Sequence, residues 1–94
     1  MGFMEDAIDE GMAAQNKELA ECNQVVEQVM DELRRATRQH GPMKSGHEGY
    51  AVILEEVDDL WHEIKHGTKS KARKEALQVA AMAVRLIANC YSKV

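Results

Sequence analysis

The sequence predicts an all-α protein, built as an antiparallel helical hairpin preceded by a long N-terminal helix. The chain has one proline, Pro42, so little in it interrupts a helix. Apolar residues recur every three or four positions over long stretches, which is the period of an α-helix. Only 4% of the residues are aromatic, so aliphatic side chains must form the core. With 94 residues, we expect a single domain spanning 1–94.

The first helix is predicted over residues 13–39. Its apolar residues alternate between spacings of three and four, which gives a heptad-like stripe suited to packing on other helices. These residues are Leu19, Cys22, Val26, Val29, Leu33 and Ala36. The helix is expected to end before Gly41-Pro42. Residues 1–12 contain Gly11 and a weak apolar pattern, so we expect a frayed start or a separate short helix.

The second helix is predicted over residues 46–65. Ser45 and Glu48 have the spacing of a capping box, which marks a helix start. The apolar residues fall on one face of this helix, which we expect to pack in the core. They are Tyr50, Ile53, Leu54, Val57, Leu60, Trp61 and Ile64. The same helix contains an acidic run, Glu55-Glu56-Val57-Asp58-Asp59. Its acids lie at the edge of the apolar face or on the opposite side of the helix.

The third helix is predicted over residues 70–91. Residues 76–88 are apolar nearly all round, with polar interruptions only at Gln78 and Arg85. A helix of this kind is buried on most sides, so we expect a second subunit and an oligomeric assembly of the four-helix-bundle type. The polar residues share one face, which is expected to meet the acids of the second helix. They are Glu75, Gln78, Arg85 and Asn89.

The acids of the second helix predict a metal site with the third. Glu56 and Asp59, like Glu75 and Gln78, are three residues apart and therefore share a helix face. If the connector 66–70 folds the helices antiparallel, Asp59 lies level with Glu75, and Glu56 with Gln78. Such oxygen ligands suit Mg²⁺, and Mn²⁺ accepts them as well. The alternative interpretation is a solvated acidic face without a metal.

A cation at these acids would neutralise phosphate groups, which indicates a phosphorylated substrate. Arg85, or a connector lysine such as Lys74, would add positive charge at the leaving phosphate. Asn89 is a candidate ligand of a base or ribose, or it satisfies a buried backbone group. Trp61 is expected in the core, with the wall of a base pocket as the alternative.

Charge and hydropathy limit the other partners. The formal charge of −4 argues against a nucleic-acid polymer. The sequence has neither a run of about 18 apolar residues nor a secretory signal pattern, so we expect no membrane association and a cytoplasmic location. Cys22 and Cys90 lack a CxxC spacing, so we expect two buried free thiols in a reducing compartment.

At the acidic motifs the chain resembles the MazG-like, all-α nucleoside triphosphate pyrophosphohydrolase superfamily. That superfamily carries EExxE on one helix and ExxD on the next, whereas here the motifs read EExxD from Glu55 and ExxQ from Glu75. The stretch from His40 to about Ala88 is similar to a phage- and prophage-associated branch. It contains HGPMKSGHEGYAVILEEVDDLWHEIKHG and, further on, EALQVAAMAVRLI.

The resemblance implies Mg²⁺-dependent hydrolysis of a nucleoside triphosphate to its monophosphate and pyrophosphate. By position, Glu56, Asp59 and Glu75 would be metal ligands, and Glu55 a further ligand or the group that orients the water. Gln78 stands where the superfamily has its last aspartate, which removes one negative charge from the site and should weaken cation binding. The resemblance also implies a homodimer or a dimer of dimers, with active sites walled partly by the partner.

Overall fold

A computed structural model describes the backbone of residues 2–93 and the side-chain surroundings of residues 10–93. It contains three α-helices, α1 (Gly2–Gln39), α2 (Gly46–His66) and α3 (Lys69–Leu86), followed by a short π-helical segment, η1 (Ile87–Tyr91). No strand occurs within residues 2–93, so the all-α prediction is confirmed. None of the helices in this range is long and apolar enough to cross a membrane.

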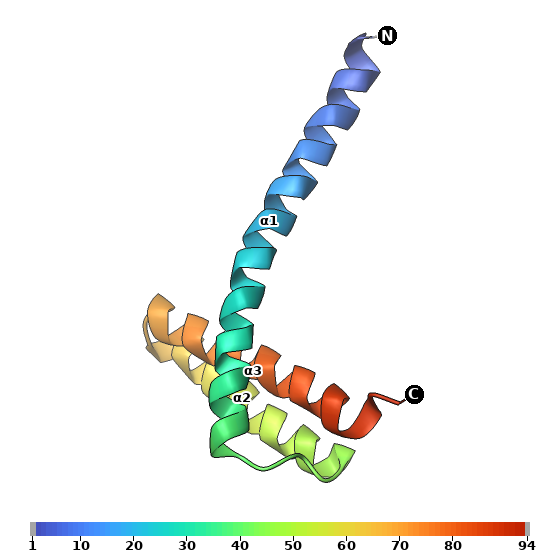
Figure 1. Cartoon of the computed structure of the whole chain (residues 1–94). Helices are drawn as coiled ribbons and strands as arrows, with labels where there is room; N and C mark the ends of the chain where they lie inside the picture. The colour runs from blue at the N-terminus through green and yellow to red at the C-terminus, as the bar shows by residue number, and fades with distance from the viewer. Residues whose placement is uncertain (1, 94) are drawn as a thin grey trace.

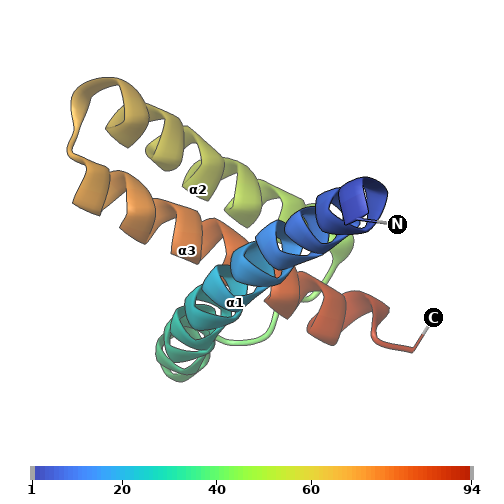
Figure 2. The ribbon, with the colours of Figure 1, turned by 90° about the horizontal axis from the view of Figure 1, so that it is seen from above.

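The helices form an antiparallel hairpin with a long helix rising from it (Figure 1). Seen from above, α2 and α3 lie side by side, and α1 crosses α3 (Figure 2). The hairpin and the preceding long helix are therefore arranged as the sequence predicts.

α1 is a single continuous helix that begins at Gly2. The prediction of a separate short helix before Ala13 is therefore wrong for residues 2–12, and residue 1 lies outside the described part. Gly11 does not end the helix, because it does not adopt the positive φ of a C-terminal cap. A glycine inside a helix costs only about 1 kcal/mol relative to alanine, and no proline accompanies it.

Side-chain caps define where α2 and α3 begin. Oγ of Ser45 accepts a hydrogen bond from the backbone N–H of Glu48 at 3.1 Å, as predicted. The Glu48 carboxylate accepts from the backbone N–H of Lys44 at 2.9 Å, one residue earlier than a capping box requires. Oγ1 of Thr68 accepts from the backbone N–H of Lys71 at 3.2 Å, so α3 begins at Lys69. The connector is thus reduced to Gly67 and Thr68.

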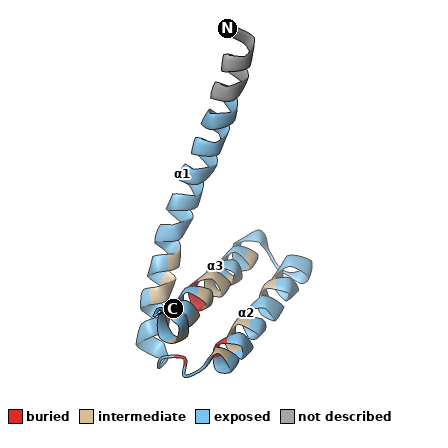
Figure 3. Cartoon of the chain, turned by 90° about the vertical axis from the view of Figure 1, so that its right-hand side faces the viewer, coloured by how far each residue is buried: buried red, intermediate tan, exposed pale blue. Residues whose placement is uncertain are grey.

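The core lies where α1 crosses α3, above the loop of residues 40–45 that leads into α2. Its buried members are Ala36, Met43, Ala81 and Met82, with Val29, Leu33, Val52, Ile53, Leu86 and Cys90 packed around them. α2 and α3 approach closely at Gly49, where an added Cβ would overlap Cδ1 of Leu86. The core is small, and among residues 10–93 no large side chain is completely buried (Figure 3).

Much of the predicted core stripe of α2 lies outside this core. Ile53 and Leu60 are half-buried, whereas the other members are 40–65% exposed. The exposed members are Tyr50, Leu54, Val57, Trp61 and Ile64. Helical periodicity identified an apolar face correctly, but no helix in the described part of the chain covers it. The prediction that Trp61 packs in the core is therefore wrong within the single chain. α3 is likewise not enclosed, since Val84 is 45% exposed, and Cys22 of α1, expected to be buried, is an exposed free thiol.

Candidate metal centre

Three carboxylates from two helices converge near the middle of the hairpin. Glu56 and Asp59 belong to α2, and Glu75 belongs to α3. One carboxylate oxygen from each lies within 4.8 Å of the others. The convergence follows from the spacing of three residues on α2 and from the short connector, which sets Asp59 level with Glu75. The structure therefore brings together the three predicted carboxylate ligands.

Gln78, the fourth predicted ligand, contacts the same carboxylates. With its amide nitrogen toward the acids, it donates to Oε2 of Glu56 at 2.9 Å and to Oε2 of Glu75 at 2.8 Å. This orientation gives the amide partners of the right kind, because the amide oxygen would only meet other acceptors there. Gln78 thus holds the acids together as a donor, and it would have to turn over to offer its oxygen to a cation.

The surroundings of Glu56 raise the pKa of its carboxyl group above the ordinary value. Burial is the largest cause, followed by the negative charges of Glu75 and Asp59, a side-chain hydrogen bond with Glu75 and the charge of Glu32. Crowded carboxylates of this kind resist ionising together, and a bound cation removes that resistance. The donor set is all oxygen, as a hard divalent cation requires, so the residues present fit Mg²⁺.

A cavity of about 550 Å³ adjoins the centre, between the lower end of α1, the loop 40–45 and the hairpin. Glu56 and Gln78 belong to both the cavity wall and the acidic centre. Three cationic residues, Arg35, Lys44 and Arg85, also line it, together with the acids Glu32, Glu48 and Glu55. The cavity wall therefore carries charges of both signs beside the carboxylate cluster, so an anionic ligand there would need a cation bound with it.

α1 contributes to this cavity, which was not predicted from the sequence. Nε of Arg35 donates to both carboxylate oxygens of Glu32 at 3.1 Å. Asp31 and Arg34 form the same kind of pair one position earlier. The spacing is identical, so only the fold tells which pair faces the hairpin. The Glu32 side chain is 14% exposed, whereas that of Asp31 is 77% exposed.

Arg85 and Asn89 face the loop, not the acids. NH2 of Arg85, a buried residue, donates to the backbone oxygen of Gly41 at 2.7 Å and of His40 at 3.4 Å. Oδ1 of Asn89 accepts from the backbone N–H of Met43 at 2.8 Å. The prediction that the whole polar stripe of α3 meets the acids of α2 is therefore wrong for these two residues. Arg85 still forms part of the cavity wall, but its guanidinium is engaged in holding the loop.

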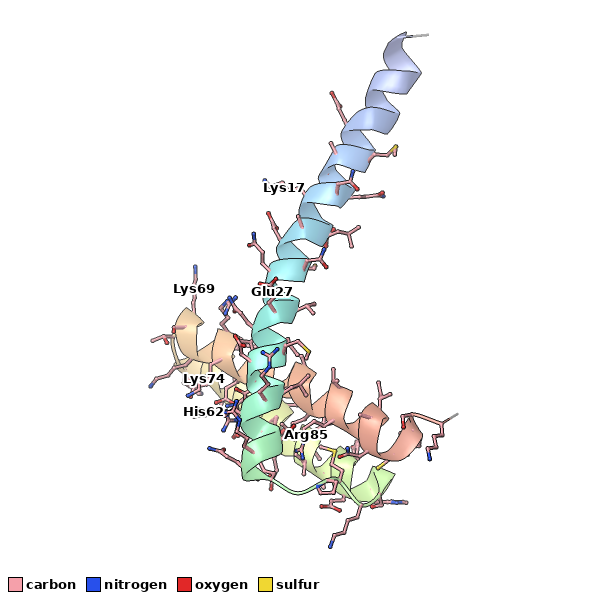
Figure 4. The ribbon with its side chains drawn as sticks, viewed as in Figure 1. Lys17, Glu27, His62, Lys69, Lys74 and Arg85 are labelled. Atoms are coloured by element: carbon pink, nitrogen blue, oxygen red, sulfur yellow. The ribbon has the colours of Figure 1, made fainter. Side chains whose placement is uncertain are left out.

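The remaining candidate residues lie outside the cluster of three carboxylates. Glu55 lines the cavity but is not one of the three converging acids. Trp61 is 56% exposed outside the cavity, with Nζ of Lys65 at 5.1 Å from the centre of its ring. Lys74 is exposed and likewise outside the cavity lining. Figure 4 shows Lys74 toward the connector end of the hairpin and Arg85 near the base of α1.

Chemically, the centre offers three carboxylate oxygens to a divalent cation. Of the cationic residues in the cavity wall, Arg35 pairs with Glu32 and Arg85 binds the loop, which leaves Lys44 for an anion. No protein-family model, curated protein or solved structure matches this chain.

Proposed function

We propose that this protein is a MazG-like pyrophosphohydrolase, which hydrolyses a nucleoside triphosphate to its monophosphate and pyrophosphate with the help of Mg²⁺ or Mn²⁺. One observation carries the proposal. Glu56, Asp59 and Glu75 converge within 4.8 Å beside a cavity of about 550 Å³ that also contains cationic side chains. A triphosphate needs both elements, because its charge must be neutralised and its chain held in place.

In this proposal Glu56, Asp59 and Glu75 hold the cation, which when bound supplies positive charge to the phosphates and lowers the pKa of water. Glu55, in the cavity wall, orients the attacking water and accepts its proton. The water oxygen forms a bond to the α-phosphorus while the bond to the bridging oxygen breaks, so pyrophosphate leaves. Lys44 binds the phosphates in place of Arg85, whose guanidinium holds the loop, and Arg35 joins it once its pair with Glu32 opens.

The proposal includes a homodimer or a dimer of dimers that acts on the nucleotide pool of the cytoplasm. Apolar residues of α2 that no part of the described chain covers support such an assembly. The phage-associated character of the sequence belongs to the same proposal, because it rests on the resemblance alone.

Pyrophosphate release from a panel of ribo- and deoxyribonucleoside triphosphates tests the proposal. With Mg²⁺ present, we expect at least one triphosphate to yield equal amounts of monophosphate and pyrophosphate, and excess EDTA to stop the reaction. Glu75→Gln should abolish release, because it removes one converging carboxylate. Asp58→Asn, an exposed neighbour outside the centre, should keep it. A well-folded protein that turns over no member of the panel would refute the proposal.

A second candidate is a weakened or inactive relative that binds a nucleotide or a protein partner without hydrolysis. The observation that favours it is Gln78, whose amide bridges Glu56 and Glu75 where the superfamily has a carboxylate. Titration calorimetry separates the two candidates. Nucleotide binding without turnover, together with activity gained by Gln78→Asp, would identify a decayed enzyme. Full activity of the wild type would exclude this candidate.

A further inference from the structure

The connector end of the hairpin carries an excess of positive charge that the net charge of the chain conceals. Residues 65–74 contain five of the twelve Lys and Arg residues and none of the sixteen Asp and Glu residues. Their formal charge is therefore +5, which leaves −9 for the rest of a chain whose net charge is −4. We call residues 65–74 the basic tip. Its cations are Lys65, Lys69, Lys71, Arg73 and Lys74.

None of these cations forms an ion pair within the described residues. All five are exposed, and the two ion pairs found among residues 10–93 both lie on α1. The acids nearest along the chain are engaged elsewhere, because the Glu63 carboxylate lies against Gly67 and Glu75 belongs to the acidic centre. Figure 4 shows Lys69 and Lys74 at the connector end of the hairpin. The positive charge of the basic tip therefore faces solvent.

The start of α3 carries lysines against the preference of the helix itself. The N-terminus of a helix has a partial positive charge, so acids stabilise the first turn and cations do not. The first turn of α3 has no acid. Lys71 stands three residues after the N-cap Thr68, where a capping box has Glu or Gln. Helix stability therefore does not account for Lys69 and Lys71.

The composition of the basic tip suits a phosphodiester backbone better than a protein surface. Protein interfaces centre on aromatic and apolar anchors and are depleted in lysine, whereas interfaces with nucleic acid are polar and strongly positive. Ala72 is the one aliphatic residue within 65–74, and it is half-buried. The basic tip therefore has no apolar anchor for a protein or for the interior of a membrane. Lysine contacts phosphate as a point charge, without a fixed orientation.

The size of the basic tip also suits a nucleic acid. Lys69 and Lys74 are five residues apart on α3, which is about 7.5 Å of helix. Lys65 belongs to α2, whose axis packs about 8–10 Å from that of α3. The patch is thus about 10 Å across, close to the Debye length of about 8 Å at physiological salt, so its charges act together. A duplex carries about six phosphate charges over the same length.

We propose that the basic tip binds the phosphodiester backbone of a nucleic acid without reading its sequence. The net charge predicted no such partner, because it averages the basic tip with an acidic remainder. The inference goes beyond the proposed function, since none of residues 65–74 lines the cavity beside the acidic centre. Binding here needs no metal ion and no turnover. Its free energy comes from counterions that the lysines release from the backbone.

Fluorescence anisotropy of a labelled DNA duplex tests the proposal, with EDTA present so that no cation occupies the acidic centre. With a duplex of about 20 base pairs at about 50 mM salt, we expect a dissociation constant of the order of 10 µM. Between about 50 and 200 mM salt the affinity should fall by about 40- to 500-fold, which corresponds to about three to five phosphate contacts. No binding by the wild type, or an affinity that does not change with salt, would overturn the proposal.

Charge reversal at the start of α3 locates the surface. Lys69→Glu with Lys71→Glu should weaken binding at about 50 mM salt by at least about 10-fold and lower the salt slope by about two. Both changes place acids in the first turn, so the melting temperature should not fall. Lys17→Glu with Lys93→Glu changes the net charge equally, away from the basic tip, and should bind within about threefold of the wild type. Glu75→Gln, which alters the acidic centre, should bind at least as tightly as the wild type.

A Lys69→Glu, Lys71→Glu variant that binds like the wild type would overturn the proposal. If that variant melts at a lower temperature than the wild type, Lys65→Gln with Lys74→Gln replaces it, and unchanged binding would again be decisive. Polyglutamate should compete more weakly than the duplex, because an extended chain has about half its charge density. Vesicles containing phosphatidylserine should also bind more weakly. Equal or tighter binding to either would assign the basic tip to an acidic protein or to a membrane surface instead.

Discussion

Replacing Glu56 by glutamine should stabilise the protein without a cation and remove its response to Mg²⁺. The substitution keeps the shape of the side chain but deletes its charge. In the absence of a cation, Glu56 lies close to the carboxylates of Glu75 and Asp59, with oxygens within 4.8 Å. Each repulsion at this separation is worth about 1 kcal/mol in water and about 3.5 kcal/mol at an effective dielectric constant of 20.

The centre is half open to solvent, so the lower figure applies to each of the two repulsions. The amide of Gln78 also loses a charged acceptor, which offsets about 1 kcal/mol. The net gain is therefore about 1 kcal/mol, which corresponds to about 4–8 °C in melting temperature for a domain of this size.

Thermal unfolding at one fixed protein concentration, in EDTA and in Mg²⁺, measures both effects. In EDTA the Glu56→Gln variant should melt above the wild type. With Mg²⁺ at tenfold its dissociation constant, the wild type should gain about 1.4 kcal/mol, and the variant should gain almost nothing. Asp58→Asn removes a neighbouring charge outside the centre and should respond to Mg²⁺ like the wild type. Equal stabilisation of wild type and Glu56→Gln by Mg²⁺ would refute the reasoning.

The other predictions concern the same centre and the residues that hold the loop and the hairpin in place. Gln78→Asp should lower the melting temperature in EDTA, because it adds a fourth acid, and raise Mg²⁺ affinity in calorimetry; weaker Mg²⁺ binding would contradict this. Arg85→Met should cost about 1–3 kcal/mol in urea unfolding, since it leaves loop carbonyls unpaired. Gly49→Val should cost about 1–3 kcal/mol by the same assay, because the added atoms overlap Leu86. In EDTA, the raised pKa of Glu56 should add stability that is fully present below the ordinary pKa of 4.5 and lost as the pH rises through the raised value. A pH series of melting curves should show this contribution in the wild type and not in Glu56→Gln.

The sequence was sufficient for the hairpin and for the convergence of its acids. Helical period and the cap at Ser45 are local properties, so they could be read along the chain. The cap at Thr68 is equally local but was not predicted. The meeting of Asp59 with Glu75 needed only the spacing on each helix and a short connector. These features do not depend on any distant contact.

Features that depend on distant contacts were not predictable. Arg85 and Asn89 bind a loop more than forty residues earlier, and the path of that loop leaves no mark on helical periodicity. Glu32 faces the cavity only because of the angle at which α1 crosses α3. The apolar face of α2 was identified, yet periodicity cannot say whether the same chain or another covers it. Trp61 was therefore expected in the core and lies exposed.

The proposal that Glu56, Asp59 and Glu75 hold one divalent cation is tested most directly by adding Mn²⁺ to the isotope-labelled protein. Paramagnetic broadening in its NMR spectrum should appear first at the amide signals of these residues and of Gln78. Excess Mg²⁺ should reverse it, and Glu75→Gln should prevent it. Broadening spread over the exposed acids of α1 and α2, or unchanged by Glu75→Gln, would contradict a cation site at the hairpin.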